Sequence, residues 1–94
     1  MPTVTNNNRG FKNIETGSVT GDGVNTQYTV TFATERPNTE YDIILTPVGD
    51  AGGDLTAYVR NSSKTTTGMI IFGISRGSNA LPLTDTIKWM VADA

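Results

Sequence analysis

Carboxylates, hydroxyls and amines are the side chains of this chain that could do chemistry, because it contains no histidine and no cysteine. The usual general base near neutral pH, the thiol nucleophile and the common transition-metal ligands are therefore absent. The nearest acidic pairs are Glu35 with Glu40 and Asp50 with Asp54. Both pairs lie among turn-forming residues, where solvent-exposed carboxylates are expected. We predict that the chain is not an enzyme and uses no cofactor.

Two weaker chemical patterns leave alternatives open. Asp50 and Asp54 could offer oxygen ligands to calcium, but the loop over 49–54 lacks the alternating acidic spacing of an EF-hand. The string Ser62-Ser63-Lys64 contains the residue types of serine–lysine catalysis, although nothing nearby marks an oxyanion hole. We predict no metal site and a solvent-exposed turn over 62–68. A small hydrolase that uses Asp50 and Asp54 is the enzymatic alternative.

Two aromatic side chains could instead stack on the face of a sugar. Trp89 lies in a terminal run that alternates apolar and polar residues, so we expect it in the core, where it completes a sheet. Tyr58 shares a strand face with Thr56 and Arg60, which places an apolar ring beside hydrogen-bonding groups. Tyr58 is therefore the better candidate for contact with a ligand. Packing within the chain is the alternative for its ring.

Length and charge limit the class of protein that could present these side chains. Ninety-four residues allow one domain with a modest core. A formal net charge of −2 argues against a surface that neutralises a phosphate backbone. No apolar stretch approaches the ~20 residues of a membrane span, and the N-terminus does not resemble a signal peptide. We expect no nucleic-acid partner, no membrane insertion and no Sec-type export.

The elements that position the candidate residues are predicted to be strands. The chain is rich in threonine, asparagine and glycine and poor in leucine, which is typical of pleated strands and tight turns. Short alternating runs predict six strands, over 14–20, 27–32, 40–48, 55–61, 69–75 and 86–92. No run predicts a helix. We expect an antiparallel β-sandwich over 14–94, preceded by a polar N-terminal arm or linker over 1–13.

The strand expected over 40–48 has apolar residues on both faces. Tyr41, Ile43 and Leu45 share one face, whereas Ile44 and Val48 stand on the other beside polar residues. A face turned to water needs less apolar material, so this pattern is what a subunit contact would require. Edge packing within one chain is the alternative. Oligomerisation would also stabilise a small domain that has no disulfide.

Six short strings follow one another along the chain in a recognisable order. They are Val30-Thr31-Phe32-Ala33, Arg36-Pro37, Tyr41-Asp42-Ile43-Ile44-Leu45, Val59-Arg60-Asn61, Thr67-Gly68-Met69 and Ile87-Lys88-Trp89-Met90-Val91-Ala92. Their order and spacing, over about residues 14 to 94, resemble the H-type lectin fold and the C-terminal receptor-binding tips of bacteriophage tail fibres and tailspikes. The resemblance implies a six-stranded antiparallel β-sandwich that assembles as a homotrimer.

The same resemblance implies a function and a place in the virion. Such a domain lies at the distal end of the tail fibre or tailspike and binds a cell-surface polysaccharide of the bacterial host, without catalysis. The remainder of the fibre is then a partner of the domain. The alternative is a structural module that trimerises or stabilises the fibre and has no ligand site of its own. The apolar second face of 40–48 and the strongly apolar strand over 69–75 favour this alternative.

In H-type lectins the sugar lies in a shallow cleft near the subunit contact. The loop before the second strand, the outward face of the fourth strand and the loop after the fifth form this cleft. In this chain the corresponding residues are Asp22, Gly23, Asn25, Thr56, Tyr58, Arg76 and Gly77. Thr56 stands where the family has a sugar-binding arginine, and Arg76-Gly77 stand where it has an aromatic–histidine pair. The resemblance therefore does not imply specificity for amino sugars.

Overall fold

The computed structural model describes residues 12–49, 55–74, 80–81 and 85–93, and these residues form six strands. The strands are β1 (Lys12–Thr20), β2 (Gln27–Thr31), β3 (Asp42–Val48), β4 (Thr56–Val59), β5 (Gly68–Ile74) and β6 (Thr86–Asp93), with the 3₁₀ turn η2 (Asn61–Ser63) after β4. Each strand begins and ends within two residues of its predicted bounds. The prediction of an all-β fold with six strands is confirmed. In the described ranges no helix is long and apolar enough to cross a membrane.

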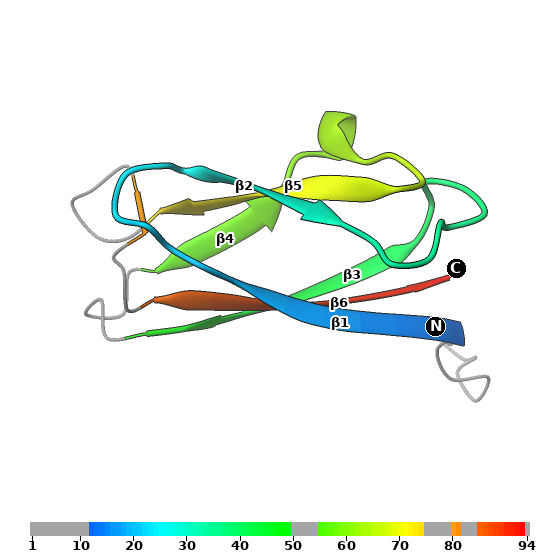
Figure 1. Cartoon of the computed structure of the whole chain (residues 1–94), viewed down its shortest axis with the longest axis horizontal. Helices are drawn as coiled ribbons and strands as arrows, with labels where there is room; N and C mark the ends of the chain where they lie inside the picture. The colour runs from blue at the N-terminus through cyan, green and yellow to red at the C-terminus, as the bar shows by residue number, and fades with distance from the viewer. Residues whose placement is uncertain (1–11, 50–54, 75–79, 82–84, 94) are drawn as a thin grey trace, which may run out of the picture.

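The six strands form two antiparallel sheets of three strands each (Figure 1). Sheet A has the order β1-β6-β3, and sheet B has the order β2-β5-β4. The strongly apolar strands β6 and β5 are central, so each is hydrogen-bonded on both sides. Pro47 lies in β3, an edge strand, where the missing N–H of a proline is tolerated.

One hydrophobic core receives side chains from both sheets. Ile87, Trp89 and Val91 project into it from β6, and Met69 and Ile71 project into it from β5. This is a β-sandwich-like arrangement. The side chain of Trp89 is 8 % exposed, which confirms that the last strand completes the core with its tryptophan. The homotrimer and the finer likeness to H-type lectins stay predictions.

Close packing of the Trp89 ring requires a glycine in the neighbouring strand. Gly17 of β1 is the register partner of Trp89, so both residues face the core. A Cβ atom added at Gly17 would stand 2.5 Å from Cζ2 of the indole. On the core side, the centroid of the Phe32 ring lies 6.0 Å from that of Trp89. The indole therefore has little room to yield to a larger residue at position 17.

The predicted faces of β3 and β4 are also confirmed. Ala57 and Val59 of β4 pack against the core, whereas Tyr58 between them is 47 % exposed. On β3, Ile44 and Val48 are 44 % and 46 % exposed, on the face of sheet A that points away from the core. The chain therefore leaves apolar surface on both outward faces. The subunit contact expected at β3 stays a prediction.

Candidate functional site

A stacked aromatic pair lies on the outward face of sheet B. Tyr58 of β4 and Phe72 of β5 are direct register partners, so their side chains project from the same face. Their ring centroids are 5.2 Å apart and the ring planes differ by 12°. Phe72 is only 8 % exposed, whereas Tyr58 is half exposed. A buried ring thus supports a second ring that remains open to solvent.

Arg60 packs against the same buried ring. Its guanidinium carbon lies 4.6 Å from the centroid of Phe72, which is a cation–π contact. The side chain is exposed, and no described residue forms a hydrogen bond or an ion pair with its guanidinium. We call Tyr58, Phe72 and Arg60 the aromatic platform.

Polar side chains surround the aromatic platform. Gln27 of β2 is the register partner of Phe72 on its other side, and Thr29 follows it on the same face. Thr56 projects outward from β4 beside Tyr58. Gln27, Thr29 and Thr56 are all exposed. An open ring bordered by amide and hydroxyl groups suits a sugar, whose C–H face stacks on an aromatic ring and whose hydroxyls form hydrogen bonds.

Asp22 organises the loop between β1 and β2. Its carboxylate accepts hydrogen bonds from the backbone N–H groups of Val24 and Asn25, both at 2.8 Å, and from the Tyr28 hydroxyl at 3.1 Å. These bonds, above all the one from the Asn25 backbone, hold the pKa of Asp22 well below its usual range. Gly23 has a φ of 76°, which favours glycine. The acceptor atoms of Asp22 are thus used within the loop.

The structure places five of the seven predicted site residues. Thr56 and Tyr58 lie on one outward face of β4. The loop that contains Asp22, Gly23 and Asn25 leads into β2 at the end of sheet B where Thr56 lies. Thr56 pairs with Ile74 of β5, and the N–H of the preceding residue, Gly73, donates a hydrogen bond to the Thr26 carbonyl oxygen at the end of this loop. Strand β5 separates this loop from β4. The other two predicted residues, Arg76 and Gly77, lie outside the described residues.

Phe72 is a residue of the site that the sequence did not predict. The strand that contains it is apolar on both faces, so alternation alone gives no reason to turn Phe72 outward rather than inward. Its pairing with Tyr58 depends on the register of β4 against β5. Arg60 carried a usable signal, since it shares the predicted strand face of Tyr58. Its stacking on Phe72 could not be predicted without that register.

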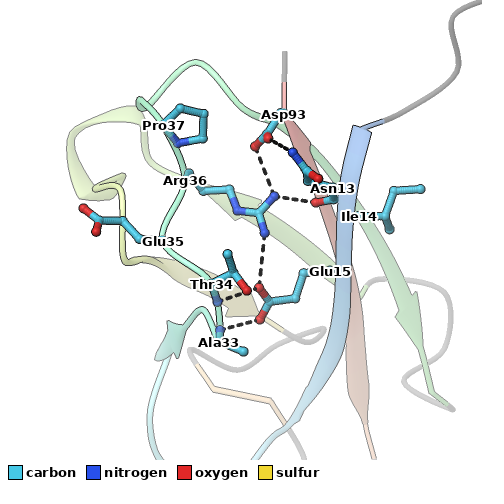
Figure 2. Close-up of a pocket in the computed structure, with 9 residues that line it drawn as sticks. All are labelled: Asn13, Ile14, Glu15, Ala33, Thr34, Glu35, Arg36, Pro37 and Asp93. Carbon is cyan, nitrogen blue, oxygen red and sulfur yellow. Dashed lines mark hydrogen bonds and ion pairs between the residues drawn. The ribbon is translucent and has the colours of Figure 1, made fainter.

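A second polar cluster surrounds Arg36, in the loop after β2 (Figure 2). The guanidinium forms ion pairs with Glu15 Oε1 at 3.3 Å and with Asp93 Oδ1 at 3.2 Å. It also donates a hydrogen bond to the Asn13 carbonyl oxygen. Arg36 is only 3 % exposed. One buried cation is therefore held between two carboxylates, from β1 and β6.

The Arg36 cluster joins the loop after β2 to sheet A. The Glu15 carboxylate accepts hydrogen bonds from the backbone N–H groups of Ala33 at 2.7 Å and Thr34 at 3.4 Å (Figure 2). A hollow of about 530 Å³ lies beside these residues. Of the charged groups that line it, Arg36, Glu15 and Asp93 are paired with one another, and these bonds cross between elements far apart in sequence. We therefore assign this cluster a structural role.

The described residues do not bring the candidate catalytic side chains together in one site. Within the described ranges, no three acidic side chains gather where they could hold a metal ion. Asp50 and Asp54, the basis of the calcium and hydrolase alternatives, lie outside those ranges. The Lys64 ammonium lies 4.8 Å from the centroid of the Tyr41 ring, and the Ser63 hydroxyl donates to a backbone carbonyl oxygen at 2.8 Å. Lys64 and Ser63 thus contact different partners and not each other.

Comparison with known proteins gives no match. No family model fits the chain, and no curated protein and no solved structure matches it. The resemblance to H-type lectins and phage tips therefore stays a prediction from the sequence, and the function has to be argued from the site.

Proposed function

We propose that this chain is a non-enzymatic glycan-binding domain, of the kind found at the tips of phage tail fibres and tailspikes, that attaches the virion to a cell-surface polysaccharide of the bacterial host. The half-exposed Tyr58 ring, stacked on the buried Phe72 and bordered by Thr56 and Gln27, is the observation that carries the glycan site. The resemblance of the sequence to phage tips is the basis for the biological setting.

The stack prepares Tyr58 for a ligand at low entropic cost. An exposed tyrosine on a bare strand samples several rotamers, and ordering it would subtract from the binding free energy. Here the Phe72 ring, itself buried, holds the Tyr58 ring nearly parallel to it, with an angle of 12° between the planes. The exposed part of the ring is then a fixed apolar surface for the C–H face of a sugar.

Screening on a glycan array, followed by titration of the hits, tests this proposal. We expect Tyr58→Ala to weaken binding of each hit about tenfold or more, because stacking on an aromatic ring contributes on the order of 1–3 kcal/mol for a nucleic-acid base and we expect a comparable value for a sugar face. Lys64→Gln is the control, since Lys64 packs on the Tyr41 ring and not on the aromatic platform. Equal binding by the Tyr58→Ala variant, or no binding to any surface polysaccharide of the actual host, would contradict the proposal.

A structural trimerisation module is the second candidate function, and the outward face of sheet A favours it. Ile14, Ile44 and Val48 are all substantially exposed there. A hollow of about 430 Å³, lined in part by Met90 and Lys88, lies on the same face. Further copies of this chain are the proposed occupants, because a domain of this size gains stability by covering such a surface.

Sedimentation equilibrium separates the two candidates. A homotrimer of the 10.0 kDa chain has a mass of about 30 kDa. We expect Ile44→Asp to reduce this mass to that of a monomer, and Thr29→Asp, on the outward face of sheet B, to leave it unchanged. A wild-type trimer that adsorbs to cells only with an intact Tyr58 supports the glycan-binding function. A trimer that does not adsorb to cells supports the structural one.

A further inference from the structure

The distribution of charge on the outward face of sheet B bears on which class of glycan the site would bind. The strand residues on that face are Gln27, Thr29 and Thr31 of β2, Ile70, Phe72 and Ile74 of β5, and Thr56 and Tyr58 of β4. None of them is charged. Arg60, which directly follows β4, is thus the one charged side chain that the described residues place on the platform.

Arg60 is oriented but not neutralised. Its contact with Phe72 restricts the side chain, since the guanidinium carbon lies 4.6 Å from the ring centroid. No described carboxylate forms an ion pair with it. Asp22, in the loop that leads into β2, uses its oxygens for hydrogen bonds to Val24, Asn25 and Tyr28. Among the described residues, none takes up the charge or the N–H donors of the Arg60 guanidinium.

We propose that the aromatic platform binds a glycan that carries an anionic group, with the sugar ring on Tyr58 and the anionic oxygens on the Arg60 guanidinium. The inference depends on the proposed glycan-binding function and specifies its ligand. A planar guanidinium matches two oxygens of a carboxylate or a phosphate and forms paired, charge-assisted hydrogen bonds with them. The Tyr58 ring and the Arg60 guanidinium both contact Phe72, so one ligand could reach both of them.

The test compares acidic polymers with neutral counterparts. The probes are oligogalacturonate and polysialic acid, each beside its carboxyl-reduced form, and a glycerol-phosphate teichoic acid beside dextran. Titrations with wild-type protein, Arg60→Gln, Arg60→Lys and Tyr58→Ala are carried out at low and high salt. Lys64→Gln is the control, because Lys64 packs on Tyr41 and not on the platform. The carboxylate and phosphate probes show which anion the site prefers.

We expect at least one acidic probe to bind about tenfold or more tightly than its neutral counterpart, and we expect Arg60→Gln to remove this preference. Arg60→Lys should retain part of it, Lys64→Gln all of it, and added salt should weaken binding. Equal binding of neutral and acidic forms that still depends on Tyr58 would overturn the inference and leave the proposed function standing. No binding of any glycan would overturn both.

Discussion

Arg36 and Arg60 are the same side chain in two opposite settings. Arg36 is 3 % exposed and lies between Glu15 and Asp93. Arg60 is exposed, stacked on Phe72 and without an ion-pair partner among the described residues. In the first setting the charge is cancelled inside the fold, and in the second it remains available at the surface. The comparison shows why the hollow beside the Arg36 cluster is a poor guide to the ligand site here.

Desolvation explains the different roles of the two arginines. A buried charge is tolerated only when partners replace the water that it loses, and Arg36 receives two carboxylates and a backbone carbonyl. Even so, its Nε is buried without a hydrogen bond. Removal of Arg36 would leave two carboxylates without their cation. Removal of Arg60 would leave no carboxylate of the described residues without an ion-pair partner.

The largest expected effect is loss of stability on replacement of Arg36. We expect Arg36→Met to lower the free energy of unfolding by about 3 kcal/mol or more, because the variant leaves Glu15 and Asp93 close together and uncompensated. Urea unfolding followed by Trp89 fluorescence measures the change. Arg60→Met is the matched control, and for it we expect a loss of less than about 1 kcal/mol. Equal losses for the two variants would invalidate the comparison.

A smaller loss of unfolding free energy is expected at Gly17, where the Trp89 ring leaves no space for a side chain. Gly17→Ala places a methyl group against the Trp89 indole and should cost about 1–3 kcal/mol of unfolding free energy. The same urea experiment measures it. Ser18→Ala, at the next position of β1 and on the outward face, is the control and should change stability by less than about 0.5 kcal/mol. An unchanged midpoint for Gly17→Ala would show that the indole moves freely.

Replacement of Phe72 tests the aromatic stack of the platform and leaves the charge of Arg60 in place. Phe72→Leu keeps an apolar side chain at this position but removes the ring that Tyr58 and Arg60 contact. We expect a stability loss below about 1.5 kcal/mol and a several-fold weaker affinity for glycan. Ile70→Leu, on the same face of β5, should leave the affinity unchanged. Wild-type affinity in Phe72→Leu would show that the stack does not prepare Tyr58 for the ligand.

The smallest expected effect depends on pH. Because hydrogen bonds lower the pKa of Asp22 in the fold, its contribution to stability is complete above the ordinary value of 3.8 and is lost as the pH falls below it. We therefore expect Asp22→Asn to melt below the wild type at pH 7, and the difference in Tm to shrink between pH 4 and pH 2. A difference in Tm that is constant over this range would contradict this role of Asp22.

Sequence periodicity predicted the strands and their faces, but not their partners. Alternation placed Trp89 in the core and Tyr58 outside, because burial on one face of a strand leaves a period of two in the sequence. Strand order and register depend on contacts between distant residues, such as Tyr58 with Phe72 and Arg36 with Asp93. No local pattern records those contacts. The sequence placed Arg60 beside Tyr58, but the partners of both arginines became known only from the fold.

Chemical-shift mapping tests the central claim most directly, that the ligand site lies on the outward face of sheet B. An acidic glycan identified by titration is added to ¹⁵N-labelled protein and the backbone amide shifts are followed. We expect the largest changes in β4, in the residues after it at Arg60, and in β5 around Phe72. Changes confined to sheet A or to the residues around Arg36 would contradict the account.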